Sequence, residues 1–243
     1  MTTYNGIDFD VVKKAIISTK IMIKQILTTM MIAASSTLVF AQMKNVGSFT
    51  KLKVFDQINV ELVPGDEYKA DISGKNAGNV EFVNSGNELK VRMVTSKVMQ
   101  GDATKIILYY KNLGSIQASQ GSVVSSTSPV HVSNLSLISN EGSVIDIVAE
   151  TSALNTKVNT GGLIKISGES TTQDVVVNAG GKYDAAGFKT ENTSVTVNAG
   201  GEANVYASQD VTATTRAGGV INVYGNPENR NDKKVIGGKV NYK

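Results

Sequence analysis

The chain contains no cysteine and only one histidine, His131, among its 243 residues. Disulfide bonds, thiolate nucleophiles and zinc sites built from several cysteines or histidines are therefore excluded. Tryptophan is also absent, and only three prolines are present. Glycine is abundant by contrast, with 23 residues, and serine, threonine, asparagine and valine are frequent beside it. This composition is typical of an exposed all-β protein with many tight turns.

The abundant residues recur with a period. The pentapeptide VNAGG occurs at residues 177–181 and again at 197–201, each time after an alternating apolar run. Equivalent glycines recur at intervals of 18 to 21 residues, namely Gly121, Gly142, Gly161, Gly180, Gly200 and Gly218. Mostly apolar residues follow each glycine at the third and fifth positions, with polar residues between them. Alternation that restarts in the same register at each glycine predicts a solenoid in which one repeat forms one coil.

The turns themselves suggest how the coils are joined. Asparagine stands two residues before four of the glycines, and like positions of successive coils stack about 4.8 Å apart. The four amides are therefore expected to form a ladder, which Arg216 cannot continue because a guanidinium has no acceptor. Unrelated glycine-rich hairpins are the alternative interpretation. The residues assigned to structural turns are Asn140, Gly142, Asn159, Gly161, Asn178, Gly180, Asn198, Gly200 and Gly218.

Residues 22–41 have the organisation of a signal peptide. Lys24 precedes an apolar run from Ile26 to Phe40, and Ala41 lies before a predicted cleavage site at Gln42. The run is short for a membrane span, although a buried or membrane-anchoring helix is the alternative. We interpret residues 1–21 as an upstream over-extension and leave the true start open between Met1 and Met22. The protein is then expected to be exported to the periplasm, to the outer surface or into the medium, with no stable membrane span after cleavage.

Residues 42–243 are predicted to form a single β-helical domain. Residues 46–113 alternate with a different rhythm, and we interpret them as an N-terminal β-layer that covers the first coil. Residues 114–225 hold the repeated coils, and residues 226–243 are expected to form a capping turn and a last strand. The segment from residue 42 onward carries 20 basic and 19 acidic residues. This balance predicts no nucleic-acid partner, and the charges are interpreted as scattered over a solvated surface.

Several stretches together resemble a known family. LVPGDEYKADISG at 62–74, GSVIDI at 142–147, the two VNAGG turns and GGVINVYGNP at 218–227 resemble the auto-transporter adhesin head-domain family, which is common in secreted proteins of Bacteroidetes. The resemblance covers roughly residues 46–243. It implies a right-handed, single-stranded parallel β-helix, distantly similar to pectin lyases but without a recognised catalytic set. It also implies a non-enzymatic, adhesin-like binding or structural module at the surface or in the periplasm.

A polysaccharide-active β-helix enzyme, either a lyase or a hydrolase, is the alternative function. Such an enzyme needs clustered carboxylates and a base. We interpret the acidic residues that follow the turns, Asp146, Asp184 and Glu202, as lying in different registers, and Glu150 and Asp174 as lying in loops. His131 alternates with valines and is expected to be a solvated strand residue. The sequence therefore predicts no catalytic residue, no cofactor and no metal site.

Two tyrosines are the candidates for a binding surface. Tyr206 and Tyr224 each stand six residues after a turn glycine, so they are expected to stack on adjacent coils and to face outward. Exposed tyrosines could hold the face of a sugar or a partner protein, or they could support the β-surface by cross-strand packing. A glycan or a cell-surface protein is accordingly the expected class of partner, and an oligomer stays open.

Overall fold

The computed structural model describes residues 3–4, 7–8, 18 and 42–243 of the chain. The chain divides into two units, Met1–Phe40 and Ala41–Lys243. In the first unit, strands β1 (Thr3–Tyr4) and β2 (Ile7–Asp8) pair antiparallel. The predicted signal peptide at residues 22–41 lies outside the described residues. No helix among the described residues is long and apolar enough to cross a membrane.

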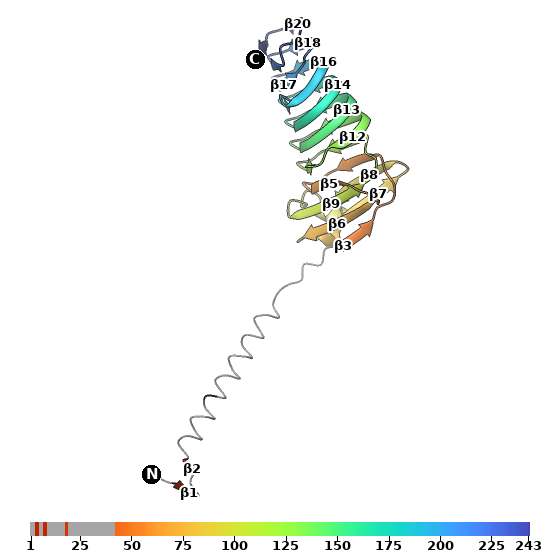
Figure 1. Ribbon diagram of the computed structural model, residues 1–243, viewed down its shortest axis with the longest axis vertical. Coiled ribbons are helices and arrows are strands. Elements are labelled where there is room, and N and C mark those ends of the chain that lie inside the picture. The colour runs from red at the N-terminus through yellow and green to blue at the C-terminus, as the bar shows by residue number, and fades with distance from the viewer. Residues whose placement is uncertain (1–2, 5–6, 9–17, 19–41) are drawn as a thin grey trace. The chain divides into compact units, whose positions relative to one another are not determined.

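The second unit is a β-solenoid of about seven turns, which confirms the predicted fold class. Its coils pair mainly in parallel along one sheet (Figure 1). Its helical elements are two three-residue 3-10 helices, η1 (Ala77–Asn79) and η2 (Thr95–Lys97). The strands in residues 42–125 are β3 (Gln42–Asn45), β4 (Lys51–Val54), β5 (Asn59–Pro64), β6 (Lys69–Gly74), β7 (Val80–Ser85), β8 (Glu88–Met93), β9 (Thr104–Tyr110), β10 (Ser115–Ala118) and β11 (Val123–Ser125). The remaining strands are β12 (Val130–Ser139), β13 (Val144–Val158), β14 (Leu163–Val177), β15 (Lys182–Asp184), β16 (Phe188–Asn198), β17 (Glu202–Tyr206), β18 (Asp210–Arg216), β19 (Val220–Tyr224), β20 (Asn229–Val235) and β21 (Lys239–Tyr242).

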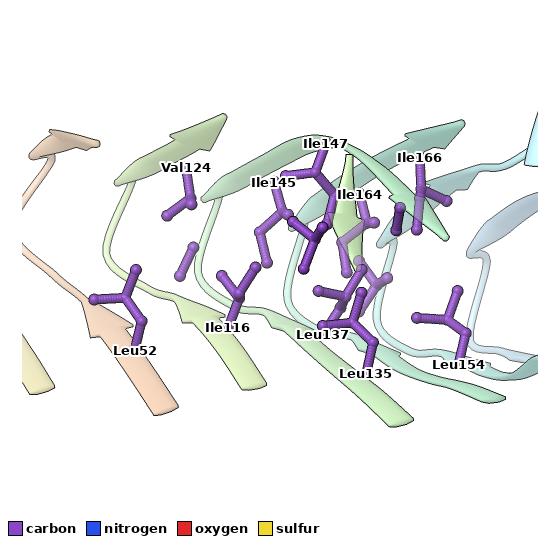
Figure 2. Packing of buried hydrophobic residues seen from close by; sticks show 14 of the residues in the cluster. Leu52, Ile116, Val124, Leu135, Leu137, Ile145, Ile147, Leu154, Ile164 and Ile166 are labelled. Carbon is purple, nitrogen blue, oxygen red and sulfur yellow. The ribbon is translucent and has the colours of Figure 1, made fainter. Parts of the chain in front are cut away.

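The core of the solenoid lies between strands on opposite faces of the coils. Leu52, Ile116 and Leu137 form one inward row by parallel pairing. The facing row contains Val124, Ile145 and Ile164. Figure 2 shows side chains of both rows filling the space between the strands, and all six are fully buried. Because strand side chains alternate between faces, each such row buries one apolar residue per coil, worth about 1.5–3 kcal/mol when fully buried.

The first coils do not stack in the order of the sequence. β4 lies between β8 and β10 and is parallel to both, and β5 lies in the same way between β9 and β11. The chain therefore leaves the β4–β5 coil, builds a coil outside it from β8 and β9, and returns to the other side. Residues 46–113 thus contribute two coils to the stack and not only a covering layer. Antiparallel strands cover the outer end: β6 pairs with β9 and with β3, and β7 pairs with β8.

The capping turn expected to lead from residue 226 to the last strand is itself a strand over most of its length. β20 (Asn229–Val235) pairs parallel with β18, and all seven of its residues are exposed. The pairing of β21 with β19 completes this coil. A strand with no covered face has no apolar alternation, so its sequence carried no strand signal.

Charged residues occupy inward positions at this end of the stack. Arg230, Asp232 and Lys234 continue the inward rows that contain Val211, Ala213 and Thr215. The Tyr242 hydroxyl donates a hydrogen bond of 2.6 Å to Asp232 Oδ1. The Arg230 guanidinium lies 4.1 Å from the centroid of the Tyr242 ring. Inward-pointing charges of this kind discourage another sheet from pairing with the end coil.

Candidate functional site

The repeated glycines lie in four-residue corner turns. Gly142, Gly161, Gly180, Gly200 and Gly218 have φ between 70° and 90°, and the residue before each also has positive φ. The Gly181 N–H closes one of these turns by donating to the Asn178 carbonyl at 3.0 Å. Two successive left-handed residues disfavour most side chains, so a glycine at the second of them lowers the strain.

The two glycines of VNAGG serve different purposes. A Cβ on Gly180 would meet no atom within 4 Å, so only its φ of 70° requires glycine. A Cβ on Gly181 would lie 2.9 Å from Val158 Cγ1 and 3.1 Å from the Val158 carbonyl oxygen. The second glycine is therefore needed because the previous coil comes too close for a side chain.

An asparagine ladder runs along the corners. Asn159 Nδ2 donates to Asn140 Oδ1 at 2.8 Å, Asn178 donates to Asn159 at 2.7 Å, and Asn198 donates to Asn178 at 2.7 Å. Asn140 donates in turn to Ser119 Oγ at 3.2 Å. Arg216 follows Asn198 in register. These hydrogen bonds account for the repeated asparagines by a structural role that needs no ligand.

A second ladder was missed by the sequence analysis. Asn222 Nδ2 donates to Asn204 Oδ1 at 2.8 Å, and Asn241 donates to Asn222 at 2.9 Å. The signal was available, because each of these residues stands four positions after a corner glycine. The repeat was too short to recognise without the register of β21, because its corner glycine, Gly237, was not among the equivalent glycines identified from the sequence.

The expected placement of the acidic residues was wrong in two respects. Asp146 and Asp184 do share one row, with Lys165 between them, whereas Glu202 lies beside Lys182 in a neighbouring row. The charges in the shared row alternate in sign, so the two carboxylates are separated by an ammonium group.

Glu150 and Asp174 lie within the long strands β13 and β14 and not in loops. These strands continue through a bend, where Gly168 has a φ of 113°, so the break in alternation was misinterpreted as a loop. His131 is exposed on β12, and its Nδ1 lies 3.2 Å from Glu150 Oε2. Within the described residues, no group of three or more histidine, aspartate or glutamate side chains could hold a metal ion.

Tyr206 and Tyr224 are register neighbours on β17 and β19, and both are half-buried. The ring of Tyr206 is packed against Gly225, since a Cβ on that glycine would lie 2.6 Å from Tyr206 Cζ. Glycine at 225 therefore makes room for the ring on the neighbouring coil.

A buried polar cluster lies behind Tyr206, and it was not predicted. Gln173 is only 2% exposed and occupies an inward row between Leu154 and Thr193. Its Nε2 lies 3.0 Å from each of three acceptors, Thr190 Oγ1, Thr193 Oγ1 and the Tyr206 carbonyl oxygen. A buried polar group needs such partners, because leaving it unpaired costs about 1–3 kcal/mol.

Tyr183 completes the cluster from the opposite face of the core. Its hydroxyl donates to Gln173 Oε1 at 3.0 Å, and burial raises the pKa of the Tyr183 phenol well above its usual range. Thr193 Oγ1 also donates to the Tyr206 carbonyl at 2.7 Å. The backbone that carries Tyr206 is therefore fixed from inside the solenoid.

Two hollows lie next to each other on β14 and β16, because one lining includes Thr172 and Asn192 and the other includes Thr171 and Glu191. One has a volume of about 330 Å³, and its polar lining includes Asn155, Asp174, Asn192, Ser194, Asp210 and Thr212. The other, here named the Tyr206 hollow, has a volume of about 380 Å³ and is lined by Thr151, Glu169, Ser170, Thr171, Lys189, Thr190, Glu191, Tyr206 and Ser208. It combines hydroxyl groups, charges of both signs and one aromatic ring. Such a surface can form hydrogen bonds to a polyol and contact its apolar face.

Comparison with known proteins agrees with this architecture. Two solved structures described as putative adhesins are similar: one from Bacteroides fragilis, at 18% identity and a TM-score of 0.77 over 86% of this chain and 98% of that chain, and one from Parabacteroides distasonis, at 18% identity and a TM-score of 0.69 over 84% and 96%. A third, described as a putative lipid binding protein from Parabacteroides distasonis, has 14% identity and a TM-score of 0.64 over 84% and 96%. At such identities the likeness shows the fold alone.

Sequence comparison identifies the family of the protein, whereas the structural likeness shows only its fold. No curated protein matches the chain. Residues 48–227 match the family described as "Putative auto-transporter adhesin, head GIN domain". Since the match covers well over half of the chain, this protein belongs to that auto-transporter adhesin head-domain family.

Proposed function

We propose that this protein is an exported, non-enzymatic, adhesin-like module that binds a glycan in the Tyr206 hollow. The observation that carries the proposal is the half-buried Tyr206 ring, which lines a hollow rich in hydroxyl and charged groups. A tyrosine ring offers an apolar face to a sugar, and the surrounding polar side chains can satisfy its hydroxyls.

The rigidity of the hollow supports a binding role. Gln173 and Thr193 hold the Tyr206 carbonyl at 3.0 Å and 2.7 Å, and both side chains are almost fully buried. A preformed site loses little conformational freedom when it binds, so more of the contact energy is available as affinity. Tyr224, one coil further along, would extend the aromatic surface for a longer glycan.

Membership of an adhesin family supports the same class of function. Export follows from the signal-peptide interpretation of residues 22–41 and is compatible with a periplasmic, surface-attached or released protein.

A cell-surface protein is the other partner class expected from the sequence. We favour a glycan because the hollow is small, polar and fitted with one ring, whereas stable protein interfaces cover a much larger area.

A glycan array followed by calorimetric titration of the glycans that bind tests this function. Tyr206→Ala is expected to weaken binding about tenfold or more, equivalent to about 1.4 kcal/mol. Tyr109→Ala is the matched control, because Tyr109 is a half-buried tyrosine facing outward from β9, and it lies outside the hollow. Equal affinities for Tyr206→Ala and the unmodified protein would contradict the proposed site.

The same glycans should be incubated with the protein and assayed for new reducing ends. Binding without turnover supports a non-enzymatic module. Turnover that survives rigorous purification would instead support the polysaccharide lyase or hydrolase alternative and would overturn the non-enzymatic assignment.

A further inference from the structure

The charges of this protein are concentrated by region and not scattered, which corrects the interpretation made from the sequence. Residues 216–243 contain six basic and two acidic side chains, whereas residues 141–215 contain four basic and nine acidic ones. The basic group belongs to the β20–β21 coil and the corner that precedes it. This coil lies at the opposite end of the stack from β3 (Figure 1).

Parallel pairing places the basic residues around one corner, Val235–Gly238. Arg216 is the register neighbour of Val235, and Lys239 continues the row of Val220 immediately after the corner. Lys233 and Lys234 come immediately before it, and all four basic side chains are exposed. We name Arg216, Lys233, Lys234 and Lys239 together with the residues Val235–Gly238 the basic corner.

The acids of the same coil do not neutralise this corner. Asp232 accepts the Tyr242 hydroxyl, and Glu228 lies before the start of β20, at the far end of the strand. In residues 42–243, no carboxylate lies within 4 Å of the ammonium or guanidinium nitrogens of the basic corner. The positive charges are therefore available to an external anion.

An unusual apolar residue forms the apex of the basic corner. Ile236 is 85% exposed and has a φ of 56°, a conformation in which a β-branched side chain is strained. The preceding corners have short or polar residues at this position: Gln120, Glu141, Thr160, Ala179, Ala199 and Ala217. Neither stability nor solubility favours an exposed isoleucine there. Thr160 has the same β-branched strain at a φ of 49°, so the exposed aliphatic side chain is what distinguishes Ile236 and points to a functional constraint.

We propose that the basic corner docks the protein on a bilayer that contains anionic phospholipids, with Ile236 entering the headgroup region. Lysines beside an anionic surface each strengthen binding by roughly fivefold. An exposed aliphatic side chain adds affinity only if it is removed from water, as it is at the edge of the acyl region. A soluble anionic ligand would use the lysines but would leave Ile236 without a role.

The family match ends at residue 227, so every residue of the basic corner except Arg216 lies beyond the part of the chain that the family accounts for. The proposal is also independent of the Tyr206 hollow, because the two sites share no residue. The protein could therefore bind a glycan on one side of the solenoid while its end coil rests on a bilayer.

Co-sedimentation of the purified protein with vesicles tests the proposal. We expect binding to vesicles that contain phosphatidylglycerol, weaker binding as salt is raised, and little binding to phosphatidylcholine alone. The triple variant Lys233→Gln, Lys234→Gln, Lys239→Gln should bind roughly 100-fold more weakly. Ile236→Asn should bind roughly tenfold more weakly while folding at least as stably, since asparagine tolerates positive φ.

Two controls separate this site from general charge and hydrophobicity. A control triple variant, Lys157→Gln, Lys165→Gln, Lys182→Gln, removes the same amount of positive charge from the middle coils. It should leave vesicle binding almost unchanged. Ala179→Ile places an isoleucine at the same position of a corner that is followed by one lysine, Lys182, in place of the four basic residues, and it should not increase binding. If Ile236→Asn binds vesicles as well as the unmodified protein does, or if both lysine triples weaken binding equally, the proposal is overturned. A soluble polyanion such as dextran sulfate binding with the same affinity as the vesicles would overturn it in the same way.

Discussion

Asn178 donates its side-chain amide to Asn159 Oδ1 at 2.7 Å and accepts the amide of Asn198 at 2.7 Å. Each asparagine of the ladder can therefore link the coil before it to the coil after it. Asparagine suits this role because its side chain is both donor and acceptor, whereas a guanidinium only donates. The corner thus carries a line of hydrogen bonds that is independent of the backbone sheet.

Replacing Asn178 with leucine should lower the free energy of unfolding by about 1–3 kcal/mol, because Asn159 and Asn198 each lose a partner. Lys182→Ala, on the exposed side of the same coil, should change it by no more than about 0.5 kcal/mol. Urea unfolding of both variants measures the difference. Indistinguishable transition midpoints would show that the ladder contributes nothing to stability.

The two glycines after Asn178 should tolerate different substitutions. At Gly180 the cost is backbone strain alone, so Gly180→Asn should be mild and Gly180→Val should be the most damaging change at this corner. At Gly181 any side chain meets Val158, so Gly181→Asn should destabilise by about 1–3 kcal/mol despite its tolerance of turns. Thermal melting of the three variants tests the order. The explanation fails if asparagine is tolerated equally at both positions.

Stability should fall at alkaline pH in part because of Tyr183. Burial raises the pKa of its phenol above the unfolded value of about 10. A raised folded-state pKa gives stability that is fully present below pH 10 and is lost as the pH rises above it, because only the unfolded chain can then release the proton. Tyr183→Phe should therefore flatten the decline of unfolding free energy with pH above 10. It should also lower stability at neutral pH, because Gln173 Oε1 loses its donor.

The pH effect can be separated from the neutral-pH effect by titrating unfolding free energy across the alkaline range for both proteins. If the curves of unfolding free energy against pH are parallel for Tyr183→Phe and the unmodified chain, other groups cause the loss of stability at alkaline pH. Tyr110 is one such group, because burial also raises its pKa.

The exported form should begin at Gln42. Intact-mass and N-terminal peptide analysis of protein secreted by the native cell should show loss of residues 1–41, with Gln42 free or cyclised. A variant with Ala41→Asp should be processed poorly, since the cleavage site needs a small residue there. Recovery of a full-length chain that begins at Met1 would refute both the signal peptide and the start at Met22.

Much of the solenoid was determined by the sequence alone. Asn159, Gly161, Asn178 and Gly180 revealed the period because a corner needs the same local chemistry in every coil, and local chemistry is visible in the sequence. The inward rows followed from the alternation after each corner, for example Ile145 and Ile164, since a strand exposes its two faces in turn. These features depend on residues close in the chain.

Other features were decided by the tertiary structure. The position of β8 and β9 outside β4 and β5 depends on pairing between segments far apart in the chain, and no local signal distinguishes the two stacking orders. β20 is a strand only because β18 offers it a partner, so its fully exposed sequence resembled a turn. Gln173, Tyr183 and the pair Thr190 and Thr193 come together from three strands, β14, β15 and β16. A buried polar residue is explained only when its partners are known. The Tyr206 hollow arose in the same way, from residues that meet only when the coils are stacked. The basic corner is mostly the continuous segment 233–239, and stacking adds Arg216 to it.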